Sequence, residues 1–137
     1  MNRNIWYQTG EHSSLSNLSL RYFKDLNGLH YVSVEHAYQS WKSGKFDEDI
    51  YNKDWRSGKK FRGKSVNKNI SYNLMNKIIR ASINQNKSVK LYLLSTWPDT
   101  LTHTNEKGYW RDAFPKILMD FRLELIKDNI GGGNTSS

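Results

Sequence analysis

The sequence predicts a helix-rich α+β domain with a small antiparallel β-sheet. Two observations support this class: residues 18–32 hold short apolar runs around turn residues, and later segments repeat apolar residues at helical spacing. Strands followed by several helices are typical of α+β proteins. The 137 residues suit a single domain, which we expect to span residues 1–130, and the glycine-rich tail at 131–137 is expected to be disordered.

The first predicted elements are a β-hairpin and a helix. Asn27-Gly28 is a strong turn signal between two apolar segments, so residues 18–32 are expected to pair as a hairpin. Ser33 is a favourable N-cap, and the helical spacing after it predicts a helix that ends near Ser43-Gly44. Residues 45–68 follow as a polar segment punctuated by glycines.

Apolar stripes, caps and prolines predict further helices along the chain. Pro98 follows the end of one of them, and Pro115 is expected in the first turn of the last, which comes after a polar loop at 99–113. The expected helical ranges are 47–53, 55–61, 71–84, 87–95 and a final helix from about 114 to a stop at Gly131.

Composition excludes several classes of site. The chain has no cysteine, so disulfides and thiolate zinc sites are impossible, which fits a reducing cytosol and a cytoplasmic location. The four histidines lack the spacing of metal ligands, and we expect neither a metal nor a cofactor. No apolar run approaches the roughly 18–20 residues that cross a bilayer, and no signal peptide is evident, so no membrane partner is expected.

Positive charge is concentrated between residues 53 and 68. The chain carries 21 Lys and Arg against 13 Asp and Glu, a net charge of +8, which favours nucleic acid or a pyrophosphate ligand over a neutral metabolite. One interpretation of the segment is a solvated loop and helix face. The other is a phosphate-binding surface on which Trp55 and Phe61 stack against bases. The cations are Lys53, Arg56, Lys59, Lys60, Arg62, Lys64 and Lys68, against Asp54 alone.

Residues 31–42 carry the most informative pattern in the chain. Glu35 falls in the first turn of the helix that Ser33 begins, where the helix dipole favours a carboxylate. His36, Gln39 and Lys42 follow at three-residue spacing and are expected to share one side of that helix. One interpretation is an ordinary capped and solvated helix; the other is a site that gathers a carboxylate, an imidazole, an amide and an amine.

Read as Val34-Glu35-His36-x-Tyr38-Gln39-x-x-Lys42, this segment resembles the central motif of the NADAR family, the YbiA-like N-glycosidases. The resemblance covers residues from about 5 to 126 and implies the YbiA-like fold, which is a helix-rich α+β fold. The other motifs that carry it are Ile5-Trp6-Tyr7, Leu15-Ser16-Asn17-Leu18, Leu74-Met75 through Arg80-Ala81, Leu91-x-Leu93-Leu94-x-Thr96, Tyr109-Trp110 with Asp112, and Leu118-Met119-x-x-Arg122.

The resemblance implies hydrolysis of a ribosyl C–N bond. Family members act on riboflavin-pathway intermediates or remove ADP-ribose from modified targets, including guanine in nucleic acid. Cleavage of such a bond builds positive charge on the sugar. Glu35 matches the family's catalytic glutamate, and its place in a first turn indicates an ionised group that stabilises the sugar cation or activates water.

Asp112 is the second catalytic candidate. It matches an Asp or an Asn of the family's C-terminal block, which is shortened here to residues 110–115 and lacks the glycine-rich loop of relatives. The alternative is that Asp112 is only the N-cap of the last helix.

Further side chains are expected to bind substrate. Asn17 is expected to bind substrate hydroxyls or, alternatively, to shape its loop as an Asx-turn. The functional Trp that many relatives carry aligns with Asn67 here, so base stacking is expected either to be weaker than in relatives or to come from Trp41, Trp55 or Trp110. The complete set of expected substrate-binding residues is Asn17, His36, Gln39, Lys42 and Trp110.

The leading hypothesis is hydrolysis of ADP-ribose from guanine in DNA or RNA, with ADP-ribosylated nucleic acid as partner. Lys59, Lys60, Arg62 and Lys64 are expected to hold the polymer apart from the catalytic centre. Two alternatives stay open: an N-glycosidase on ribosylamino-pyrimidine intermediates of riboflavin synthesis, and a non-catalytic module that binds ADP-ribose or nucleic acid. Basic charge favours nucleic acid over the riboflavin pathway, and Glu35 favours catalysis over binding alone.

Overall fold

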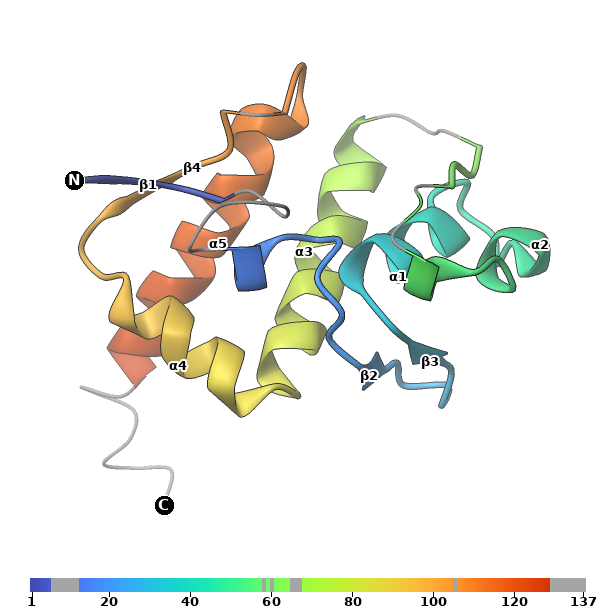
Figure 1. Cartoon of the computed structure of the whole chain (residues 1–137), viewed down its shortest axis with the longest axis horizontal. Helices are drawn as coiled ribbons and strands as arrows, with labels where there is room; N and C mark the ends of the chain where they lie inside the picture. Colours follow the sequence, from blue (N-terminus) through green and yellow to red (C-terminus); the bar gives the residue numbers. More distant parts are fainter. Residues whose placement is uncertain (6–12, 58, 60, 65–67, 105, 129–137) are drawn as a thin grey trace. The chain divides into compact units, whose positions relative to one another are not determined.

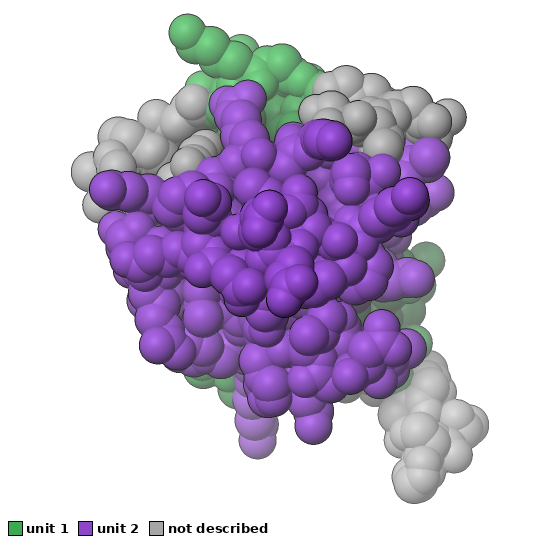
Figure 2. Space-filling model, turned by 90° about the vertical axis from the view of Figure 1, so that its right-hand side faces the viewer, with its two compact units in different colours: residues 1–15, 88–137 green, residues 16–87 purple. Residues whose placement is uncertain are grey.

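The computed structural model describes residues 1–5, 13–57, 59, 61–64, 68–104 and 106–128. By its contacts the chain divides into two compact units, one made of residues 16–87 and the other of residues 1–15 and 88–137 (Figure 2). Since the second unit contains both ends of the sequence, the chain passes between the units twice.

Unit 16–87 contains a hairpin followed by helices (Figure 1). β2 (Phe23–Lys24) pairs antiparallel with β3 (His30–Tyr31), and Gly28 at φ 85° forms the turn, as Asn27-Gly28 predicts. α1 (Val34–Trp41) follows directly and packs against both other helices of the unit. Those helices are α2 (Glu48–Tyr51) and α3 (Lys68–Asn84), with a short 3-10 helix at Trp55–Ser57 between them.

The core of this unit lies between α1 and α3. Val34, Ala37 and Tyr38 of α1 are buried, and so are Met75 and Ile79 of α3. Their spacing of three or four residues places them on one face of each helix, which is the amphipathic pattern that predicts these helices. Because Val34 belongs to this core, the first turn of α1 is fixed to the body of the unit.

Arg21 anchors the hairpin to α3 through a buried polar contact. Its Nε donates to Ser82 Oγ at 2.9 Å and its Nη1 donates to the carbonyl oxygen of Ser16 at 3.2 Å. Burial lowers the pKa of Arg21 to about 10.

The other unit contains a parallel pair of strands that the local sequence pattern does not predict. β1 (Asn2–Asn4) pairs with β4 (Thr100–Thr102), with Arg3 opposite Leu101. The unit also holds a 3-10 turn at Ser13–Leu15, α4 (Lys87–Ser95) and α5 (Trp110–Lys127). Its buried apolar residues include Leu93, Leu101, Phe114, Ile117, Leu118 and Phe121.

Two expectations for residues 99–113 are wrong. The segment is not only a polar loop, because it contains β4 and the start of α5. α5 begins at Trp110, so Pro115 lies inside the helix and not in its first turn. Tyr109 occupies the N-cap position but its side chain does not cap the helix, and Asp112 is an exposed residue of the first turn. Asp112 is therefore not the N-cap of the last helix.

Candidate functional site around Glu35

The N-terminus of α1 is fixed by contacts from two sides. Ser33 is extended at φ −158°, and its Oγ accepts from the backbone N–H of His36 at 3.1 Å, which is the cap that the sequence predicts. The backbone N–H of Glu35 donates to the carbonyl oxygen of Asn17 at 2.9 Å. The loop that contains Asn17 is thereby attached to the first turn of the helix, beside the candidate catalytic carboxylate.

Glu35 is held by a second residue of the same helix. Gln39 Nε2 donates to Glu35 Oε1 at 2.6 Å, one turn further along. Gln39 Oε1 accepts from the backbone N–H of Gly63 at 3.0 Å. Glu35, Gln39, Gly63 and Asn17 therefore form a connected group, which we call the Glu35 cluster. Lys42 continues the same helix face, and its Nζ lies 5.9 Å from the centroid of the Tyr38 ring.

His36 does not share this polar face, so that expectation is wrong. The side chain is only 6% exposed, between the rings of Tyr51 and Trp55 at centroid distances of 4.9 and 5.5 Å. Its Nδ1 accepts from the backbone N–H of Val32 at 3.1 Å, and its Nε2 lies 2.9 Å from the carbonyl oxygen of Tyr51. Because the backbone N–H of Val32 can only donate, the ring is the neutral tautomer with its proton on Nε2.

A pH dependence of folding follows from the buried imidazole. Burial lowers the pKa of His36, and the hydrogen bond to Tyr51 opposes that shift in part. Below about pH 6.5 the unfolded chain binds a proton that the folded chain does not, so stability falls as pH decreases from there toward the folded pKa. Urea titrations at pH 7.5 and 5.5 measure the free energy of unfolding at each pH. In the wild type, His36 should lower this free energy by at most about 1.4 kcal/mol for each pH unit.

The matched pair for this measurement is His36→Gln and His30→Gln, since His30 is an exposed histidine of β3. We expect the His36→Gln protein to lose less stability between the two pH values than the wild type does. The His30→Gln protein should follow the wild type. Equal pH dependence in wild type and His36→Gln would show that His36 does not titrate differently in the folded protein.

Asn17 offers an acceptor to a hydroxyl group. Its Oδ1 is buried and has no hydrogen-bond partner within the described part of the chain, while its Nδ2 lies 3.7 Å from Met75 Sδ. Buried amide oxygens in proteins are normally paired, so this atom is unusual. A sugar hydroxyl is one donor of suitable chemistry.

The basic segment does not lie apart from Glu35, and that expectation is also wrong. Gly63 belongs to it and contacts Gln39, whose other amide atom holds Glu35. Arg62 and Lys64, on either side of Gly63, are exposed, and so is Lys59. Lys60 lies outside the described residues.

Trp55 is not available to stack on a base. Its side chain is 4% exposed, its Nε1 donates to the carbonyl oxygen of Ile50 at 2.8 Å, and Phe61 packs edge-on against it. An exposed aromatic side chain does accompany the basic segment: Arg56 Cζ lies 5.7 Å from the ring centroid of Tyr22, which is 55% exposed. The sequence pattern did not indicate Tyr22, because it lies more than thirty residues away from Arg56.

Trp110 and Asp112 lie in the other unit, at the start of α5. Trp110 is half-buried and meets Tyr109 edge-on at a centroid distance of 5.0 Å. Their expected substrate-binding and catalytic roles stay predictions.

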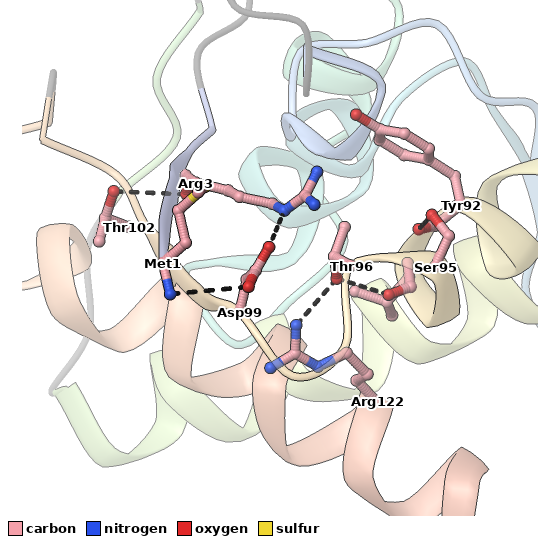
Figure 3. A network of polar contacts seen from close by, with 9 residues as sticks. Met1, Arg3, Tyr92, Ser95, Thr96, Asp99, Thr102 and Arg122 are labelled. Carbon is pink, nitrogen blue, oxygen red and sulfur yellow. Dashed lines mark hydrogen bonds and ion pairs between the residues drawn. The ribbon is translucent and has the colours of Figure 1, made fainter.

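A polar network of this same unit joins the first strand to the α4–β4 connection (Figure 3). Arg3 Nε donates to Asp99 Oδ2, and the Met1 amino group lies 3.6 Å from Asp99 Oδ1. The Arg3 guanidinium lowers the pKa of the Asp99 carboxyl. Nearby, Arg122 Nη1 donates to Thr96 Oγ1 at 2.8 Å, and its guanidinium lies against the ring of Trp97. These contacts stabilise the fold of the unit.

Neither a metal centre nor a membrane span is found in the part of the chain that the structure describes. No three His, Cys, Asp or Glu side chains there gather closely enough to hold a metal ion. None of the described helices combines the length and the hydropathy needed to cross a bilayer.

The structure is similar to the NMR structure of the E. coli protein YbiA. The TM-score is 0.74 at 24% sequence identity, and the likeness covers 96% of this chain and 88% of YbiA. No family model and no curated protein matches the sequence. The YbiA-like, helix-rich α+β fold expected from the sequence is confirmed.

Proposed function

We propose that this chain, which has the fold of YbiA, is a NADAR-type N-glycosidase that hydrolyses ADP-ribose from guanine in DNA or RNA. The observation that carries the proposal is the link from Glu35 through Gln39 to Gly63. It puts the carboxylate that matches the family's catalytic glutamate beside a segment of exposed cations. The fold of YbiA and the order of the sequence motifs support the same assignment.

Hydrolysis of the ribosyl C–N bond requires a negatively charged group near the anomeric carbon. As the ribosyl C–N bond lengthens, its electron pair moves to the base nitrogen and positive charge develops on the sugar. Water attacks the anomeric carbon; its hydroxyl stays on the sugar and its second proton ends on the departing base. Glu35, near the positive end of α1 and accepting from Gln39, stabilises the sugar cation and takes the proton from water.

Two neighbouring side chains suit the remaining groups of the substrate. Asn17 Oδ1 accepts from a ribose hydroxyl, which supplies the partner that this buried atom lacks among the described residues. Lys42, on the same helix face as Glu35, suits a phosphate oxygen. His36 acts differently, since both its ring nitrogens are used by backbone groups. It holds the N-terminal turn of α1 against Tyr51, the last residue of α2.

A nucleic-acid acceptor is favoured by the surroundings of the Glu35 cluster. Arg62 and Lys64 are exposed and flank Gly63, so we expect them to bind phosphates on either side of a modified base. Tyr22, half exposed and paired with Arg56, gives a neighbouring unpaired base a ring on which to stack. A ribosylamino-pyrimidine has no flanking nucleotide phosphates for Arg62 and Lys64 to bind.

The catalytic role expected for Asp112 stays a prediction that comes from its match to the family's C-terminal block, while the N-cap alternative is excluded. The substitution Asp112→Asn removes the charge from the first turn of α5 and should cost about 0.3–1 kcal/mol of stability through the helix dipole. We also expect turnover to fall while the melting temperature changes by only a few degrees. Initial rates and a melting curve on the same preparation test this. Equal rates for the two proteins would remove Asp112 from the reaction.

The substrate panel that tests the proposal compares three ribosyl donors. ADP-ribosylated guanine in an oligonucleotide, an ADP-ribosylated protein and a ribosylamino-pyrimidine are each incubated with the wild-type protein, and the released sugar is measured. Release from the oligonucleotide alone supports the proposal. Release only from the pyrimidine moves the chain to the riboflavin-pathway enzymes, and tight binding without release makes it a binding module.

A further inference from the structure

Gln39 is buried, and both its amide nitrogen and its amide oxygen make hydrogen bonds. Its side chain is 8% exposed, its Nε2 donates to Glu35 Oε1 at 2.6 Å, and its Oε1 accepts from Gly63 N–H at 3.0 Å. A residue in this position has little opportunity to reach a ligand itself. These contacts favour a role for Gln39 other than the substrate binding that the sequence predicts.

The direction of the hydrogen bonds fixes which atom faces Glu35. A backbone N–H only donates, so the oxygen of the Gln39 amide has to face Gly63. The amide nitrogen then has to face Glu35, and the glutamate oxygen that it meets has to be an acceptor. This sequence of donors and acceptors favours one rotamer of the Glu35 carboxylate.

Gly63 is required for this arrangement because its backbone lies against α1. A Cβ atom at Gly63 would fall well inside contact distance of the backbone carbonyl oxygen of Gln39. Any other residue at this position pushes the segment away from the helix and lengthens the bond to Gln39 Oε1. The close approach is thus specific to glycine and lies at the centre of the basic segment, between Arg62 and Lys64.

We propose that Gln39 is a positioning residue that orients Glu35 and that Gly63, at the centre of the basic segment, fixes the orientation of Gln39. The inference rests on the proposed function in one respect: Glu35 has to be the catalytic carboxylate for turnover to report on it.

Two substitutions of Gln39 separate its two hydrogen bonds. Gln39→Glu keeps an acceptor for Gly63 N–H but removes the donor to Glu35, whereas Gln39→Met removes both. We expect kcat to fall about tenfold or more in both variants, with KM within about twofold of the wild type, because misorientation of a catalytic group costs rate more than binding. Gly63→Ala should lower kcat in the same way.

The matched control is the same pair of changes at Gln85. This glutamine also uses both amide atoms, accepting from Lys24 N–H at 2.9 Å and donating to Lys24 O at 2.8 Å, but it is exposed and contacts β2 instead of the Glu35 cluster. We expect Gln85→Glu and Gln85→Met to leave kcat unchanged. Wild-type kcat in Gln39→Glu or Gln39→Met, or an equal loss in the Gln85 variants, would overturn the positioning role.

A readout without turnover separates this inference from the proposed function. We expect the backbone amide signal of Gly63 in a ¹⁵N–¹H spectrum to move in Gln39→Met and to stay close to its wild-type position in Gln39→Glu. The Glu35 carboxyl carbon signal should move in both. If the wild-type protein hydrolyses none of the substrates, the proposed function fails while these spectra still decide whether Gln39 orients Glu35; unchanged signals would contradict it.

Discussion

Glu35→Gln should lower turnover by about two or more orders of magnitude while the protein stays folded. The amide has nearly the same shape as the carboxylate but lacks the charge that stabilises the sugar cation, and it is a poor base for water. The change also places two amides against each other at the 2.6 Å contact with Gln39. The measurement is the initial rate of sugar release, with a melting curve to show that the fold is kept.

Glu48→Gln is the matched control for this change. Glu48 is exposed and stands in the first turn of α2, one residue after the N-cap Asp47, whereas Glu35 stands in the first turn of α1, two residues after the N-cap Ser33. The Glu48→Gln protein should turn over substrate at the wild-type rate. A folded Glu35→Gln protein with near-wild-type hydrolysis would exclude Glu35 from the mechanism.

Neutralising the basic segment should produce the second large effect, on binding of nucleic acid. Replacing Lys59, Lys60, Arg62 and Lys64 with Ser removes up to four cations that neutralise phosphates. On a single strand, the slope of log K against log salt should fall by about 0.7 for each phosphate that is no longer neutralised. At low salt the affinity for an oligonucleotide should fall by more than tenfold, because fewer counterions are released on binding.

The control removes the same charge elsewhere. Lys77, Lys87, Lys107 and Lys127 are exposed lysines outside the segment, and their replacement with Ser should change the salt slope much less. Turnover of a small ADP-ribosylated nucleoside should also change little, since it has no flanking phosphates. Equal losses on the small and the polymeric substrate would assign the segment to the pyrophosphate of ADP-ribose itself. Binding of the wild type without any salt dependence would refute the nucleic-acid acceptor.

Local signals in the sequence predicted the elements that depend on local interactions. Ser33 caps α1, Asn27-Gly28 turns the hairpin, and α4 spans Lys87–Ser95 as its apolar run before Pro98 indicates. Each of these rests on hydrogen bonds or steric limits within a few residues. Glu35 in a first turn is a prediction of the same kind, and its position is confirmed.

Pairings between distant residues were not predictable in this way. β1 and β4 are separated by nearly a hundred residues, and the three residues of Thr100–Thr102 are too few to show the alternation over four or more residues that marks a strand. Helical spacing predicts that His36 shares a polar face with Gln39. The neutral His36 ring is instead buried between the aromatic rings of Tyr51 and Trp55, and spacing within one helix does not indicate these partners. Nothing near Gly63 in the sequence indicates that it meets Gln39, so the segment was expected to stand apart from Glu35.

The decisive measurement for the N-glycosidase assignment is hydrolysis of an ADP-ribosylated guanine oligonucleotide in H₂¹⁸O, followed by mass spectrometry of both products. The proposed reaction breaks the C–N bond by attack of water on the anomeric carbon, so free ADP-ribose should carry one ¹⁸O and the oligonucleotide should return to its unmodified, unlabelled mass. The Glu35→Gln protein should release about a hundredfold less labelled ADP-ribose in the same time. Absence of release by the wild type, or ¹⁸O appearing on a phosphate of the products, would contradict the N-glycosidase assignment.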